Sequence, residues 1–229
     1  MTKRAALFDV DGTLIDSNDF HAEAWQRTFA HFGRDIPFDR VRAQIGKGGD
    51  NLMPALLPAD FIDANREAME AYRGDLFERD YLARIRPFPG VRALFERVRA
   101  AGFDIVLASS GTAEEVDHHL KLIEAGDLVQ SKTTADDAEN SKPDPDIFAA
   151  ALAKLPGVSA AQAVVVGDSP YDMQAAVALG IDTIGFRCGG FPDDVLLAAG
   201  CDELYDDAAD LLARFHGSLL VRTLTPDFA

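Results

Sequence analysis

Short apolar runs alternate with amphipathic segments along most of the chain. Residues 91–98, for example, carry apolar side chains at helical spacing and predict a helix. The apolar runs are almost continuously hydrophobic, which is typical of strands that are covered on both faces. The clearest of them predict strands at Ala5–Val10, Phe103–Ala108, Ala163–Gly167 and Thr183–Arg187. This alternation is the pattern of βαβ units, so we predict an α/β fold with a Rossmann-like, three-layer core around a parallel sheet.

One long segment breaks the alternation. Residues 18–86 show helical patterns and no convincing strand. A simple crossover between parallel strands needs only about a dozen residues, so this segment is too long to be one. We therefore predict a core made of residues 1–17 and 87–229, and an inserted α-helical cap subdomain at residues 18–86. The border at residues 86–90 is rich in turn-forming residues, and the two borders together are suited to act as a hinge.

The composition mainly excludes certain partners, a membrane-spanning helix and a disulfide scaffold. Acidic residues outnumber Lys and Arg by 38 to 22, which gives a formal net charge of −16. Such a charge repels nucleic acid and anionic lipid, so we expect neither as a partner. Hydrophobic residues make up 48% of the chain, but no run approaches the ~20 apolar residues of a membrane-spanning helix. Cys188 and Cys201 are too few for a disulfide scaffold and favour a reducing, cytoplasmic setting.

Two carboxylates follow the first predicted strand, in the run Asp9–Thr13. Side chains alternate along a strand, so Asp9 and Asp11 should project the same way at its carboxyl end, where open α/β sheets bind ligands. Two carboxylates that close repel each other, so either a cation lies between them or one is protonated. A plain strand-end turn is the simpler interpretation of the motif alone. A calcium-binding EF-hand loop is excluded, because it would require Gly in place of Leu14 and Glu in place of Phe20.

Another acidic residue follows the strand predicted at Ala163–Gly167. Asp168 comes directly after it, and Ser169 and Pro170 are suited to begin a helix, which would fix the direction of Asp168. Asp172 lies about one helical turn further along, and it either returns to the same site or is a solvated helix residue. Together with the first pair, these carboxylates suit a hard divalent cation such as Mg²⁺.

Hydroxyl groups follow the strand predicted at Phe103–Ala108. Ser109, Ser110 and Gly111 come directly after it. Hydroxyls and free backbone N–H groups at the start of a following helix can hold phosphate oxygens. Helix capping is the alternative role for the two serines. They are therefore candidate phosphate-binding residues.

Lys142 is a candidate counter-charge for the acidic residues. Pro143 disfavours a helical conformation at Lys142, so the lysine side chain should leave an extended segment. A lone lysine is usually a surface residue. Here it would balance a site that otherwise holds at least three carboxylates, and an acidic protein needs such a cation to attract a phosphate.

Taken in order, these four stretches resemble the motifs of the haloacid dehalogenase superfamily. The matches are Asp9–Thr13, Ser109, Lys142 and Gly167–Asp172. Each is weak alone, but the ordered set is highly specific, and the resemblance spans residues 5 to about 190. The helical segment after the first motif is similar to the family's α-helical cap of the first type. The resemblance points to the branch that contains phosphoglycolate phosphatases and β-phosphoglucomutases.

The resemblance also implies roles for these residues. Asp9 would be the nucleophile that forms a phosphoaspartyl intermediate, and Asp11 the general acid that later becomes the base. Since Asp11 must take up a proton, we expect its pKa to lie above that of Asp9. Dehalogenases of the superfamily carry another residue at position 11 and use no metal, so dehalogenation is not expected. The implied Mg²⁺ ligands are Asp9, the backbone carbonyl of Asp11, Asp168 and, in support, Asp172. The implied phosphate-binding residues are Ser109, Ser110 and Lys142.

Substrate specificity in capped members of the family resides largely in the cap. Residues 16–25 are similar to the opening of the β-phosphoglucomutase branch, in which a histidine one turn before a tryptophan helps to gate the acid/base aspartate. His21 and Trp25 occupy these positions, although His21 alternatively extends an apolar stripe into the core of the cap. Lys47 lies in the glycine-rich run Ile45–Asp50, which resembles the family's specificity loop or forms a flexible turn.

We therefore expect a Mg²⁺-dependent phosphatase, monomeric or homodimeric, that acts on a small phosphate ester such as a sugar phosphate or phosphoglycolate. A β-phosphoglucomutase-like sugar phosphomutase is the alternative. The mutases use a further cap lysine for the distal phosphate, but none occurs between Lys47 and Lys121, so Arg66 or Arg73 would have to serve. A phosphoaspartate receiver module is disfavoured, because receivers are about half this length and lack a helical insert. The tail after Asp210 carries no recognisable signal.

Overall fold

A parallel sheet forms the centre of the computed structural model, which describes residues 3–222. Within that range, six parallel strands lie in the order β5-β4-β1-β6-β7-β8. Their bounds are β1 (Arg4–Phe8), β4 (Phe103–Ala108), β5 (Ser131–Thr133), β6 (Ala163–Gly167), β7 (Asp182–Phe186) and β8 (Glu203–Tyr205). The predicted α/β fold with a parallel sheet is confirmed. Residues 1–2 and 223–229 of the predicted core lie outside the described residues.

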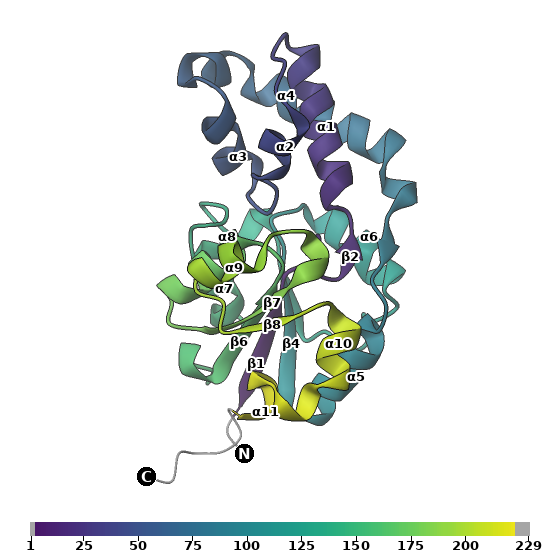
Figure 1. The fold of residues 1–229 in the computed structure, drawn as a ribbon, viewed down its shortest axis with the longest axis vertical. Helices are drawn as coiled ribbons and strands as arrows, with labels where there is room; N and C mark the ends of the chain where they lie inside the picture. Colours follow the sequence, from purple (N-terminus) through teal and green to yellow (C-terminus); the bar gives the residue numbers. More distant parts are fainter. Residues whose placement is uncertain (1–2, 223–229) are drawn as a thin grey trace.

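Helices cover both faces of the sheet (Figure 1). On one face pack α5 (Val91–Ala100) and α10 (Ala208–Ala213), and on the other α7 (Asp146–Ala153) and α8 (Pro170–Ala178). The remaining helices of the core are α6 (Ala113–Leu122), α9 (Asp193–Ala198) and α11 (Leu219–Arg222). Short 3₁₀ turns connect the elements at Ala135–Asp137, Ala160–Gln162, Arg187–Gly189 and Phe215–Gly217. No helix in the described part of the chain is both long and apolar enough to cross a membrane.

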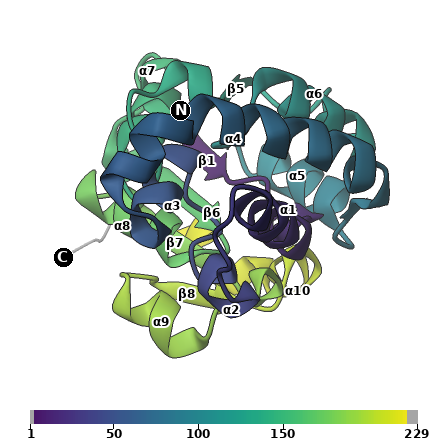
Figure 2. The same ribbon diagram turned by 90° about the horizontal axis from the view of Figure 1, so that it is seen from above.

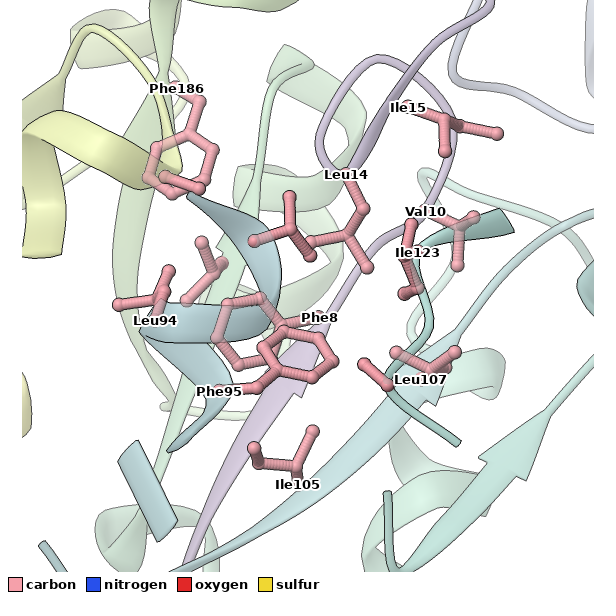
Figure 3. Packing of buried hydrophobic residues seen from close by; sticks show 14 of the residues in the cluster. Phe8, Val10, Leu14, Ile15, Leu94, Phe95, Ile105, Leu107, Ile123 and Phe186 are labelled. Carbon is pink, nitrogen blue, oxygen red and sulfur yellow. The ribbon is translucent and has the colours of Figure 1, made fainter. Parts of the chain in front are cut away.

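The position of β1 in the middle of the sheet, covered on both faces, explains why its sequence is continuously apolar. Side chains alternate along β1, so Ala6 and Phe8 enter the hydrophobic cluster on one face, while Ala5 and Leu7 enter that on the other. Phe8 packs against Phe95 of α5, with 4.8 Å between ring centroids, and both side chains are fully buried (Figure 3). The two helical layers are thereby anchored to the strand that carries the first acidic motif.

The segment between residues 17 and 86, called the insertion below, is helical and is enclosed by a short antiparallel pair. In this pair, β2 (Ile15–Asp16) aligns with β3 (Arg86–Pro87). The helices between them are α1 (Asn18–His31), α2 (Phe38–Arg42), α3 (Gly49–Leu56) and α4 (Ala59–Asp80), followed by a 3₁₀ turn at Leu82–Arg84. They bury a hydrophobic cluster of their own, and they lie across the end of the core (Figure 2). The paired strands lie at the predicted borders, whereas the division into two domains stays a prediction.

The structure also differs from the predicted strands. The edge strands β5 and β8 are absent from the prediction, because each has only three residues and β5 reads Ser-Lys-Thr. Strand β1 ends at Phe8, two residues before the predicted end. The backbone carbonyl of Val10 accepts bonds from the N–H groups of Thr13 and Leu14, which turn the chain out of the sheet.

We expect Phe95→Ala to destabilise the protein by about 3–5 kcal/mol, because it removes a large side chain from a tightly packed interface. Urea unfolding followed by circular dichroism would measure the change. Val177→Ala is the control, because Val177 is 51% exposed and its truncation should cost less than about 0.5 kcal/mol. Equal losses for the two variants would contradict the role given to the Phe8–Phe95 contact.

Candidate active site

The predicted motifs meet at one edge of the sheet. Asp9 follows β1, Ser109 follows β4 and Asp168 follows β6. These three strands are neighbours in the sheet, with β1 in the middle. Because they are parallel, their carboxyl ends lie at the same edge, beneath the helical insertion (Figure 1).

Three buried carboxylates form the centre of the site. One oxygen each of Asp9, Asp168 and Asp172 lies within 4.8 Å of the others. Asp172 reaches this cluster because it closes a capping box: its Oδ2 accepts a bond of 3.0 Å from the N–H of Ser169, the N-cap of α8. Asp172 is 1% exposed, so its alternative role as a solvated helix residue is wrong.

Lys142 lies among these carboxylates and is 1% exposed. Its Nζ donates to Asp9 Oδ1 at 2.5 Å and to the backbone carbonyl of Ala108 at 3.2 Å, and it lies 2.7 Å from Asp172 Oδ1. Burial lowers the pKa of this ammonium, but the charges of Asp172 and Asp9 outweigh that effect and raise it. Lys142 is therefore a charged group inside the site, as its place in the sequence led us to expect.

The cluster holds more negative than positive charge. Burial raises the pKa of both Asp9 and Asp168, and the neighbouring carboxylates raise it further. Three carboxylates face one ammonium, and carboxylate oxygens are the ligands that hard divalent cations prefer. The residues present thus fit a Mg²⁺ ion, whose charge would offset the excess.

Two neutral side chains orient Asp168. Thr13 Oγ1 donates to its Oδ1 at 2.9 Å, and Asn18 Nδ2 donates to its Oδ2 at 2.8 Å. Gly189 allows the carboxylate to pass, since a Cβ at that position would lie 1.8 Å from Asp168 Oδ2. Sequence reasoning missed Asn18, which is 4% exposed and whose partner lies 150 residues away.

Asp11 lies in a different environment from Asp9. Ser17 Oγ donates to Asp11 Oδ1 at 2.7 Å, and His21 Nε2 lies 2.9 Å from the same oxygen. The His21 ring stacks on Phe77 with 4.2 Å between centroids, and its Nδ1 contacts the guanidinium of Arg73. His21 therefore contacts the aspartate and also packs on an aromatic ring of α4, whereas its gating role stays a prediction.

The expected order of the two pKa values is wrong for this structure. Desolvation raises the pKa of Asp11, but the charge and the hydrogen bond of His21 outweigh it and lower this pKa. The pKa of Asp9 is instead raised by burial and by its carboxylate neighbours. His21 contacts Asp11 and not Asp9, a difference that the chemical roles of the two aspartates alone could not indicate. A divalent cation at Asp9 would act in the opposite direction and lower the pKa of its ligands.

A cavity of about 950 Å³ lies above this cluster, between the insertion and the core. From the insertion it is lined by the predicted residues His21, Trp25 and Lys47. Lys47 Nζ donates to Gln44 Oε1 at 2.7 Å and lies 4.6 Å from the ring centroid of Tyr171 in the core.

Core residues complete the cavity wall. Ser110 lines it, and its buried Oγ has no hydrogen-bond partner among the described residues. Ser109 lies deeper, 1% exposed, where its Oγ accepts from the N–H of Gly111 at 3.0 Å. One face of α6 adds residues that were not predicted as site residues. Their helical spacing could have indicated that they share one face of the helix. They are Glu114, Glu115, Asp117, His118 and Lys121.

Comparison with known proteins agrees with this geometry. The family model described as haloacid dehalogenase-like hydrolase matches residues 6–186. The chain belongs to this family. The predicted resemblance is confirmed, and with it the expectation that the protein is a hydrolase of this type.

Relatives of this hydrolase cover most of its length. A protein of Cupriavidus necator named phosphoglycolate phosphatase is 32% identical over 91% of this chain and 91% of its own. A phosphorylated carbohydrates phosphatase of Thermotoga maritima is 28% identical over 79% of this chain and 83% of its own. A crystal structure of a hydrolase from Pseudomonas syringae has a TM-score of 0.83 and 29% identity, covering 93% of this chain and 98% of that one.

We expect Mg²⁺ to raise the thermal stability of this hydrolase by binding the acidic cluster. At about 100 times its Kd, the ion would add about 2.7 kcal/mol, which corresponds to roughly 5–10 °C in Tm. Differential scanning fluorimetry with MgCl₂ against EDTA would measure the shift. Asp168→Asn should abolish it, whereas the exposed Asp35→Asn should keep it. An Asp168→Asn variant that shows the full shift would place the ion elsewhere.

Proposed function

We propose that this hydrolase is a Mg²⁺-dependent phosphatase that acts on a small phosphorylated metabolite, such as a sugar phosphate or phosphoglycolate. One observation carries the proposal: Asp9 lies at the cavity, 2.5 Å from a buried ammonium and beside two further carboxylates. A carboxylate nucleophile needs such a cation in order to approach a phosphate dianion. The names of the two relatives support a small phosphate ester as the substrate.

The reaction would proceed in two steps. In the first, the Asp9 carboxylate attacks phosphorus and the bond to the ester oxygen breaks. Asp11, which must be protonated at this stage although His21 lowers its pKa, gives its proton to the leaving oxygen. In the second, water attacks the phosphoaspartate and loses a proton to Asp11. The bond between phosphorus and Asp9 then breaks, which restores Asp9 and releases inorganic phosphate.

Transfer of this kind depends on position and charge compensation. Asp9, Asp168, Asp172 and the backbone carbonyl of Asp11 would hold Mg²⁺, which when bound supplies positive charge to the phosphoryl oxygens. Lys142 provides the second positive charge. Ser109 and Ser110, with the N–H groups that follow β4, would bind the remaining phosphoryl oxygens. His21 fixes the direction of the Asp11 carboxylate through its contact with Oδ1.

The geometry favours a phosphatase over a sugar phosphomutase. A mutase must hold a second phosphate far from the nucleophile, and Arg73 is the arginine of the insertion that lines the cavity. Its guanidinium already contacts His21 Nδ1 and lies 3.5 Å from Glu115 Oε1. This engagement leaves Arg73 poorly available to a distal phosphate. We also propose a cytoplasmic enzyme without nucleic-acid or membrane partners, and both of its cysteines are free thiols.

We expect Asp9→Asn to lower phosphate release by roughly 10³-fold or more, because an amide cannot act as the nucleophile. A screen of sugar phosphates, phosphoglycolate and nucleotides, read by phosphate release with Mg²⁺, would identify the substrate and measure the loss. Asp35→Asn should match the wild type. An inactive wild type, or undiminished release by Asp9→Asn, would reject the proposal.

With a hexose 1-phosphate as substrate, we expect free sugar and inorganic phosphate in equal amounts. Phosphorus NMR should detect no hexose 6-phosphate, whether or not a hexose bisphosphate is added, because a water molecule and not a second sugar hydroxyl accepts the phosphoryl group. Isomerisation that depends on the bisphosphate would instead establish the phosphomutase.

A further inference from the structure

The first turn of α3 contacts the core segment that carries Lys142. The carboxylate of Asp50 accepts a bond of 3.0 Å from the backbone N–H of Ser141. The side-chain amide of Asn51 donates to the carbonyl of Ser141 at 2.7 Å. Two consecutive residues of the insertion thus hold the peptide groups on either side of one core residue.

The approach of this turn to the core is unusually close. A Cβ at Gly48 would lie 2.1 Å from Ser141 Oγ and 2.5 Å from Ser141 Cβ. The φ of Gly48 is −72°, a conformation that any residue adopts, so space is what requires glycine here. A side chain at position 48 would therefore force Ser141 to shift relative to Asp50 and Asn51.

The carbonyl that Asn51 holds belongs to the peptide that joins Ser141 to Lys142. The lysine side chain is buried, and its ammonium lies 2.5 Å from the proposed nucleophile, Asp9. A displacement of the Ser141–Lys142 peptide would thus move the ammonium relative to Asp9. Phosphoryl transfer is sensitive to errors of about 1 Å in such positions.

We propose that Asp50 and Asn51 are positioning residues, which hold Lys142 against Asp9 when the insertion lies on the core. This inference rests on the proposed phosphatase function and adds a link to it. Closure over the substrate and placement of the catalytic charge become one event, since a lifted insertion releases both bonds to Ser141. The insertion would then contribute to the chemical step as well as to substrate binding.

Four variants test this link in pairs. Asp50→Ala removes one bond to Ser141. Asn51→Ala removes the other, together with the longer bonds of its amide to the Lys142 carbonyl at 3.4 Å and to Asp144 Oδ2 at 3.2 Å. Asp50→Asn keeps an acceptor oxygen for the Ser141 N–H. Asn51→Asp has nearly the same shape but turns a carboxylate toward the Ser141 carbonyl and the Asp144 carboxylate. With p-nitrophenyl phosphate and Mg²⁺, we expect both alanine variants and Asn51→Asp to lose about 5- to 10-fold in kcat. Their KM should change by less than about 2-fold, and Asp50→Asn should retain most of the wild-type kcat.

The matched control is Asp60→Ala. Asp60 is the exposed second residue of α4, as Asp50 is the second residue of α3, so its loss reproduces any effect of a first-turn carboxylate on helix stability. Its kcat should equal that of the wild type. A higher KM at unchanged kcat for Asp50→Ala would overturn the proposal in favour of simple substrate binding. Equal losses of kcat in Asp50→Asn and Asp50→Ala would also overturn it.

A second measurement needs no activity. NMR of the substrate-free protein should show faster exchange of the Ser141 amide and a shifted Lys142 ammonium signal in Asp50→Ala, with neither change in Asp60→Ala. If the wild type releases no phosphate, the proposed function fails and these signals still decide the inference. An unchanged Lys142 signal in Asp50→Ala would refute the link, even if the enzyme is an active phosphatase.

Discussion

The contact of one buried ammonium with two buried carboxylates determines the rest of this site. Moving an ion out of water costs several kcal/mol, and like charges at short range add to that cost. Lys142 offsets part of it by lying between Asp9 and Asp172. The compensation is incomplete, since Asp168 remains and the pKa values of Asp9 and Asp168 are raised. The excess negative charge of this arrangement is what a divalent cation would offset.

The parts of the fold and site that follow from local pattern could be predicted from the sequence. Strands β4 and β6 are apolar on both faces and were predicted with their observed ends. Asp9 and Asp168 follow buried strands directly, so the rule that ligands bind at the carboxyl edge of a parallel sheet was enough to bring them together. The capping box of Ser169 and Asp172 is also a local feature, but the sequence left both positions of Asp172 open, and its burial in the structure decided between them.

The parts that depend on distant partners could not be predicted. Asn18 and Asp168 are 150 residues apart, and Asp50 and Ser141 are 91 apart. Strands β5 and β8 have only three residues each, too few to stand out, and they pair with a longer neighbouring strand. The order of the pKa values of Asp9 and Asp11 could not be predicted for the same reason. It depends on which side chains face each carboxylate, and His21 faces only Asp11.

The pairing of β2 with β3 has a consequence for how proteins of this fold diversify. The insertion departs and returns at one place, where Ile15 lies opposite Pro87. Its ends are thus already adjacent, so the intervening chain can lengthen, shorten or be exchanged while the six-stranded sheet keeps its register. One reaction centre can in this way be combined with many recognition modules, and evolution can alter selectivity without rebuilding the catalytic machinery.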